Sequence, residues 1–305
     1  MHAAFPTSLF DLCHEGLIRV SGADAAIFLQ GQLSTDVEKL TANSSQLSSW
    51  SNAKGRVVTI LRLFRRGDSI YLSLPAPMLA NVKKRLTMYV LRSKVMVEDA
   101  SPALGRLGIA GPQAPDVLKT AGLMAPGEVN GLTQSGGIQV IRLHGETPRY
   151  ALYGPADLLA ALITKLETTG VRSLDAEAWA LEKILAGEPT VYPETMEHFV
   201  AQMLNLDQLG AIDFKKGCYL GQEVIARAHY RGAVKRHMHR ASSTAASELK
   251  PGIEIHAKGS DSPVAEVVDA GKDSKGIWRV LLVVQDESNG AELLAPGGTA
   301  ISLDS

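Results

Sequence analysis

The chain has 305 residues, of which 45% are hydrophobic, so it is long and apolar enough to fold into two or three domains. Its formal net charge of −1 excludes a general electrostatic attraction to nucleic acid or anionic membranes and leaves only local patches for such contacts. Because no uncharged apolar run reaches about 18 residues and residues 1–10 have no signal-peptide pattern, we expect a cytoplasmic protein without a membrane span.

Residues 1–100 predict a mixture of strands and helices. Asp24 stands at a helix N-cap position ahead of an apolar run, and apolar side chains three and four apart follow Leu79. These features predict helices at 25–29 and 79–89. Short apolar segments, two of which flank a Gly-Asp turn, predict strands at 17–20, 56–64, 70–74 and 94–98.

The middle of the chain continues this alternation and predicts an α+β arrangement. Strands are expected at 104–110, 138–143 and 149–153. Helices are expected at 114–120, 156–168 and 174–186. Gly187 and Pro189 are expected to end the last of these helices.

The chain after Ala241 predicts a small all-β module. Four short apolar runs are separated by turns rich in glycine and proline, at 252–256, 264–268, 278–284 and 299–303. Short strands joined by such turns are typical of a barrel.

One stretch has an unusual composition, because two glycines bracket a cysteine and a tyrosine. Glycines permit a sharp turn close to a ligand with the thiol of Cys218 exposed. Lys215 and Lys216 would stabilise the thiolate if their ammonium groups point toward the sulfur. The alternative is that Cys218 is a small buried hydrophobic residue of a loop. The stretch consists of Lys216, Gly217, Cys218, Tyr219, Leu220, Gly221, Gln222 and Glu223.

The other cysteine, Cys13, lies far from Cys218 in the sequence. Neither belongs to a Cys-x-x-Cys or Cys/His spacing, which argues against a disulfide framework and against a zinc or cluster site. We therefore predict no metal site and at least one free thiol.

Four segments, in the same order, resemble the YgfZ family of folate-binding proteins, which share the fold of the glycine-cleavage aminomethyltransferase, or T-protein. The segments occupy residues 22–37, 52–56, 216–223 and 226–236. The agreement is best in residues 20–65 and 175–240. Four ordered segments are far more specific than one short motif.

The resemblance implies an α+β, T-protein-like multidomain fold around a central folate channel, with a small C-terminal β-barrel. The domains it implies are a discontinuous folate-binding domain at 1–50 and 155–240, a central α+β domain at 51–154 and the barrel at 241–305. The implied cofactor is tetrahydrofolate.

The function that the resemblance implies is that of an accessory protein, which supports iron-sulfur enzyme assembly or repair and tRNA modification. Its functional thiol would be Cys218 in the stretch 216–223. The implied partners are folate, iron-sulfur enzymes or assembly proteins and, indirectly, tRNA-modifying enzymes.

Folate chemistry suits aromatic, hydrogen-bonding and cationic residues, because a pterin is flat with polar edges and the glutamate tail is anionic. On the sequence alone, Trp179 is equally well explained as a packing residue of its helix. The folate-binding residues that the resemblance implies are Trp179, Lys54, Arg56, Asn205 and Arg227.

One position departs from the family pattern. Members usually carry a glutamate two residues before the glycine that ends the helix at 174–186, whereas this chain has Leu185 there. A leucine accepts no hydrogen bond from a pterin, so recognition would shift to Glu182 or Glu188, or to another ligand.

A T-protein-type aminomethyltransferase is the first alternative function. That chemistry depends on an aspartate after a Lys-Gly segment, and this chain has Thr59 and Ile60 where an Asp-Asp pair would be expected. Neither residue can serve as an acid or a base. T-proteins also lack the cysteine stretch, so both differences favour the accessory function.

An RNA-binding module is the second alternative, because residues 224–247 contain no acidic residue. Such a basic cluster can hold phosphates. Tyr230 is its only aromatic residue other than histidine, so we expect the patch to hold the folate tail or a protein partner instead. The basic patch includes Arg227, Arg231, Lys235, Arg236 and Arg240.

Overall fold

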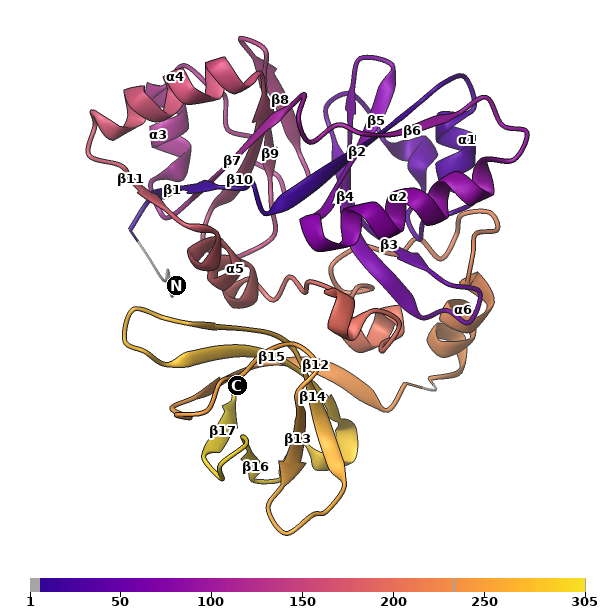
Figure 1. Cartoon of the computed structure of the whole chain (residues 1–305), viewed down its shortest axis with the longest axis vertical. Coiled ribbons are helices and arrows are strands. Elements are labelled where there is room, and N and C mark those ends of the chain that lie inside the picture. The colour runs from indigo at the N-terminus through magenta and orange to yellow at the C-terminus, as the bar shows by residue number, and fades with distance from the viewer. Residues whose placement is uncertain (1–5, 233, 305) are drawn as a thin grey trace.

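The computed structural model describes residues 6–232 and 234–304, and its strands form two open sheets and one closed barrel. Figure 1 shows the two sheets side by side above the barrel, with α5 (Ala176–Leu185) between one sheet and the barrel. Within the described residues, no helix is long and apolar enough to cross a membrane.

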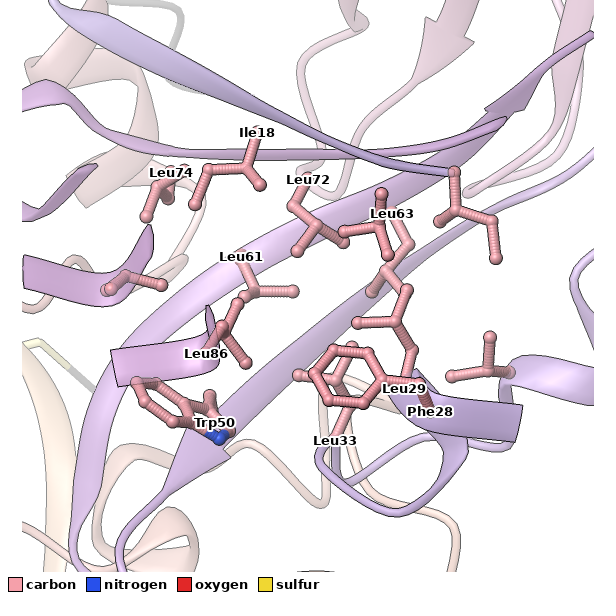
Figure 2. Packing of buried hydrophobic residues seen from close by; sticks show 14 of the residues in the cluster. Ile18, Phe28, Leu29, Leu33, Trp50, Leu61, Leu63, Leu72, Leu74 and Leu86 are labelled. Atoms are coloured by element: carbon pink, nitrogen blue, oxygen red, sulfur yellow. The ribbon is translucent and has the colours of Figure 1, made fainter. Parts of the chain in front are cut away.

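The first sheet is antiparallel and has the strand order β3-β4-β5-β2-β6. Helices α1 (Ala25–Gln30) and α2 (Ala76–Val90) pack on one face of it. Figure 2 shows Phe28 and Leu29 of α1 and Leu86 of α2 among strand residues such as Leu63 and Leu72. The strands are β2 (Glu15–Ser21), β3 (Ser45–Ser51), β4 (Val57–Arg66), β5 (Ser69–Pro75) and β6 (Met96–Asp99).

Strand β4 is buried on both faces, and this places an arginine inside the molecule. Because successive side chains of a strand point to opposite faces, Leu61 and Leu63 face the helices while Ile60, Arg62 and Phe64 face away from them. The second face packs against the other sheet and the segment after α5.

The second sheet has the strand order β11-β1-β7-β10-β9-β8, with only the β1–β11 pair parallel. Helices α3 (Ala114–Thr120) and α4 (Ala156–Glu167) pack against it. Its strands are β1 (Ser8–Asp11), β7 (Gly105–Ala110), β8 (Leu132–Ser135), β9 (Ile138–Arg142), β10 (Arg149–Gly154) and β11 (Arg172–Leu174).

The segment between the sheets and the barrel contains α5, two short 3-10 helices and α6 (Gln222–Arg231). Its apolar residues form one core with the outer face of β4 and with strands of the barrel. The 3-10 helices of the chain are η1 (Val37–Lys39), η2 (Pro193–Thr195), η3 (Ala201–Leu204) and η4 (Asp286–Ser288).

The C-terminal strands form the closed barrel β12-β15-β14-β13-β16-β17, in which β12 also pairs with β17. This confirms the predicted barrel, and β12 starts it a few residues before Ala241. Its strands are β12 (Arg236–Ser243), β13 (Glu254–Ala257), β14 (Pro263–Lys272), β15 (Trp278–Gln285), β16 (Leu293–Leu294) and β17 (Ala300–Leu303).

The predicted helices and the α+β class are confirmed, and several elements are additional. The sequence did not predict β1, β3, β8, β11, β12, β16 or α6. β3 was missed because its serines are polar and so give no apolar strand pattern. In the structure these serines are nevertheless buried and form hydrogen bonds, such as those that Ser49 donates to the Ser34 hydroxyl. The Asp24 carboxylate makes no N-cap bond and instead accepts one from the Lys94 backbone N–H at 2.7 Å.

Strand pairing also differs from the predicted domain boundaries. The boundary between residues 50 and 51 falls inside β3, one residue before its end, and β3 pairs with β4 along its length in one sheet. Strand β1 pairs with β7 and β11, so the N-terminal strand belongs to the second sheet.

Candidate functional site

A cavity lies where the two sheets, α5 and the segment after it meet. It has about 500 Å³ of empty space with its open side included. Only about 30 Å³ of this space is wide enough for the centre of a water molecule, so the walls lie close together. The polar and aromatic wall residues used below are Glu15, Arg62, Ser73, Trp179, Lys183 and Glu188.

Two arginines and a glutamate form a buried ion cluster at this cavity. Arg149 Nη2 donates to Glu188 Oε2 at 2.7 Å, and Arg62 Nη2 lies 3.9 Å from the same oxygen. Burial by itself would raise the pKa of Glu188, but the charges of Arg149 and Arg62 outweigh it and lower the pKa to about 2. Glu188 is therefore ionised at neutral pH, and the two arginines leave the cluster net positive.

Three buried nitrogen atoms in and behind the wall have no hydrogen-bond partner among the described residues: Arg62 Nη2, Arg149 Nη1 and Trp179 Nε1. Arg62 and Trp179 belong to the wall and are 5% and 1% exposed. Burying an unpaired donor costs about 1–3 kcal/mol. Such donors at a cavity therefore suit a ligand that accepts hydrogen bonds.

The wall also offers an acceptor. Glu15 Oε2 accepts a hydrogen bond from the Ser73 hydroxyl at 2.7 Å, and Lys183 Nζ lies 3.9 Å from Glu15 Oε1. Because a carboxylate has about four acceptor positions, Glu15 can accept further hydrogen bonds from a ligand. The cavity thus presents donors and an acceptor in one wall.

The barrel contributes a buried carboxyl group behind the wall. Asp269 sits at the bulge of β14, where the Tyr192 hydroxyl donates to Asp269 Oδ2 at 3.3 Å. Burial raises the pKa of Asp269 to about 6, although Lys183 and Thr190, both wall residues, act in the opposite direction.

Trp179 is both a packing residue of its helix and a residue of the cavity wall. Its ring packs against Phe10 with centroids 5.2 Å apart, and a Cβ on Gly108 would come within 2.8 Å of it. The same side chain also lines the cavity. Leu181 lies on a different face of α5, against Gly271 of β14.

Thr59 and Ile60, which stand where the resemblance implies an Asp-Asp pair, provide no carboxylate to the cavity. Ile60 lies in the wall and Thr59 is fully buried, with its hydroxyl bonded to the Ile60 carbonyl. Of the two glutamates suggested as replacements at Leu185, Glu188 belongs to the wall and Glu182 does not. The wall carboxylates are therefore Glu15 and Glu188.

The stretch 216–223 is anchored by its lysine. Lys216 Nζ donates to the backbone carbonyls of Gln30, Leu33 and Thr35, each at 2.7 Å. These bonds use all three N–H groups, so none remains for the Cys218 sulfur. Lys216 therefore anchors the stretch 216–223 to the segment 30–35 and does not stabilise the Cys218 thiolate. Burial lowers the pKa of Lys216 to about 8.

Two of the resembling segments touch through glycines. Gly221 has φ +81°, and a Cβ there would lie 2.5 Å from the Asn52 carbonyl oxygen. Gly55 has φ +69°, and a Cβ there would lie 2.7 Å from Val224. Gly217 has no positive φ and open space around it, so only Gly221 supplies the special backbone conformation that was predicted for both.

Cys218 is exposed, and no residue of the stretch 216–223 belongs to the wall of the central cavity. The stretch borders a shallow surface hollow instead. The residues around that hollow are Ala53, Tyr219, Leu220, Gly221, Gln222, Glu223 and Ala226.

The other residues expected to bind folate lie outside the cavity wall. Arg56 donates to the His198 carbonyl at 2.5 Å, and Asn205 donates to the Met238 carbonyl at 2.8 Å. Lys54 and Arg227 are exposed, Arg227 on α6. The structure therefore does not bring these four residues together with Trp179.

The basic patch likewise lies outside the cavity. Arg231, at the end of α6, and Lys235 and Arg236, at the start of β12, are exposed and absent from the cavity wall. Because these residues do not line the cavity, their positions give no support to the expectation that the patch holds the tail of a folate bound there.

Sequence reasoning missed Glu15, Arg62 and Arg149. One signal was present, because Arg62 interrupts the apolar run of a buried strand, where a charged residue needs a partner. Nothing in the sequence linked Arg62 to Arg149, which comes from a different sheet.

Three comparisons place the chain among known proteins. Residues 3–125 match the GCVT N-terminal domain family. The chain is 32% identical over 230 residues to the tRNA-modifying protein YgfZ of Colwellia psychrerythraea, covering 75% of this chain and 70% of that protein. It is also 32% identical over 234 residues to the tRNA-modifying protein YgfZ of Yersinia pestis, covering 77% and 70%.

The whole fold has a solved counterpart. The glycine cleavage system aminomethyltransferase T of Bartonella henselae aligns with a TM-score of 0.78 and 19% identity, covering 98% of this chain and 85% of that one. The likeness confirms the predicted T-protein-like arrangement with its C-terminal barrel. The sequence identity to the two curated relatives shows that the chain belongs to the YgfZ family of tRNA-modifying proteins.

Proposed function

We propose that this chain binds tetrahydrofolate in the central cavity and acts in the cytoplasm as an accessory protein for the assembly or repair of iron-sulfur enzymes and for tRNA modification. The name of the relatives, tRNA-modifying protein, supports the link to tRNA. Cys218 is proposed as the functional thiol.

The observation that carries folate binding is the pair of buried, unpartnered donors in the cavity wall, Arg62 Nη2 and Trp179 Nε1. They would donate to acceptor atoms of the pterin, and Glu15 would accept from its amino edge. Tetrahydrofolate, when bound, supplies a carrier for one-carbon units.

The residues that face the cavity favour binding over aminomethyl transfer. Glu188 is ionised but held between two arginines, and Glu15 is bonded to Ser73 and close to Lys183. The positions of Thr59 and Ile60 provide no carboxylate. No free acid or base is thus offered there to activate a folate nitrogen.

The first prediction is that the protein binds tetrahydrofolate but does not catalyse glycine-dependent methylene transfer. Isothermal titration with tetrahydrofolate should give saturable binding to one site, whereas a glycine-cleavage assay with the other components supplied should give no turnover. Transfer at the rate of a T-protein, or the absence of folate binding, would contradict the proposal.

The second prediction concerns the cavity tryptophan. Folate should quench the fluorescence of Trp179, because its ring lines the cavity. Trp179→Phe should therefore abolish most of the quenching. The matched control is Trp278→Phe, since Trp278 lies in the barrel core and donates to the Ala245 carbonyl. Equal quenching in wild type and Trp179→Phe would show that Trp179 is only a packing residue.

A further inference from the structure

One exposed surface has no part in the proposed folate cavity or in the proposed role of the Cys218 thiol. It is formed by α6, the segment 210–215 and residues between 35 and 46, and we call it the α6 groove. Arg227, Tyr230 and Arg231 are spaced three and four apart, so they share one face of the helix, and all three are exposed. Tyr230 is 71% exposed, which is unusual for so large an aromatic side chain.

The α6 groove has an aromatic floor. The rings of Phe214 and His229 stack with centroids 3.7 Å apart and planes 16° apart, and Tyr230 meets His229 edge-on at 5.0 Å. The groove has about 940 Å³ of empty space with its open side included. A flat ring entering it therefore meets both a stacked pair and an exposed phenol.

Two lysines and two aspartates line the groove, and the exposed cations of α6, Arg227 and Arg231, stand close to its lining residues His229 and Tyr230 in the sequence. Lys215 and Lys39 border the groove, and Lys39 lies 2.6 Å from Asp213 and 3.3 Å from Asp36. Along the chain, residues 224–247 contain five arginines and lysines and no acidic residue, while the whole chain carries −1. Two of these five cations, Arg227 and Arg231, belong to α6.

We propose that the α6 groove binds a single-stranded segment of RNA, with a base stacked on Tyr230 and phosphates held by Arg227 and Arg231. Cations alternating with an exposed aromatic ring suit nucleic acid, because every base has a face to stack and every nucleotide a phosphate. A duplex would keep its bases stacked on one another, so an unpaired segment fits better. The site is separate from the folate cavity, with which it shares no wall residue.

The test is fluorescence anisotropy with a labelled single-stranded RNA of about 12 nucleotides, a length that matches known single-strand sites. Tyr230→Ala should weaken binding about 5- to 100-fold, the usual effect of losing one stacked base. Arg227→Gln with Arg231→Gln should lower the slope of log Kd against log salt by about 1.4, because two phosphate contacts are lost. With an abasic oligonucleotide, Tyr230→Ala should have no effect.

The matched control is Lys119→Gln with Arg172→Gln, two exposed cations on α3 and β11, which should bind RNA like wild type. Each variant is also titrated with tetrahydrofolate, so that a loss of RNA binding is separated from a failure of the folate site. The proposal is overturned if wild type does not bind RNA at about 50 mM salt, or if Tyr230→Ala binds like the control. Equal affinity for a polyglutamate peptide would also overturn it and identify an acidic protein as the ligand.

Discussion

Replacing Arg149 with methionine is expected to lower the free energy of unfolding by about 3–5 kcal/mol, the cost of removing one partner of a buried ion pair. Arg149 is 1% and Glu188 6% exposed, and the bonded atoms are 2.7 Å apart. Without Arg149, Glu188 would keep only the longer contact with Arg62 at 3.9 Å. Urea unfolding followed by circular dichroism measures the change.

The pH dependence of the free energy of unfolding tests whether the Arg149–Glu188 ion pair is the cause of this loss of stability. The lowered pKa of Glu188, about 2, means that its contribution to stability is present above the ordinary glutamate pKa and is lost as the pH falls toward 2. Arg149→Met should lose less stability than wild type over this acid range. The control is Arg172→Met, an exposed arginine whose loss should cost under about 0.5 kcal/mol. An unfolding free energy of Arg149→Met equal to that of Arg172→Met would contradict the assigned role.

Replacing Cys218 with serine is expected to abolish function in vivo while leaving the fold and folate binding intact. The thiol is exposed, and its stretch lies outside the cavity wall. Lys216, which anchors the stretch, is untouched by this substitution. The measurement is complementation of a deletion strain, scored by the activity of iron-sulfur enzymes under oxidative stress, with folate titration of the purified variant in parallel.

Cys13→Ser is the matched control, because Cys13 is the other exposed thiol. Burial and the neighbouring Asp11 raise the pKa of Cys13, which disfavours its thiolate and hence its reaction with alkylating agents. Alkylation should therefore modify Cys218 first. Full complementation by Cys218→Ser, or faster alkylation of Cys13, would leave the stretch 216–223 as a structural turn only.

The sequence by itself determined the α+β class, most helices and strands, the C-terminal barrel and the family. These follow from local patterns: the spacing of apolar residues in α2 and α4, the glycine and proline turns of the barrel, and four ordered segments. Local patterns failed where burial depends on distant partners, as in β3, whose serines form hydrogen bonds with Ser34.

Only the tertiary structure decided which charged side chains contact one another and which atoms each of them binds. Arg62, Arg149 and Glu188 come from one sheet, the other sheet and the segment after α5, and no local pattern connects them. Lys216 precedes Cys218 by two residues, yet its ammonium donates to carbonyls that are 181 to 186 residues away in the sequence. The physical reason is that a buried charge is stabilised by whichever partners the packed chain brings within hydrogen-bond distance, and sequence neighbours have no advantage in that choice.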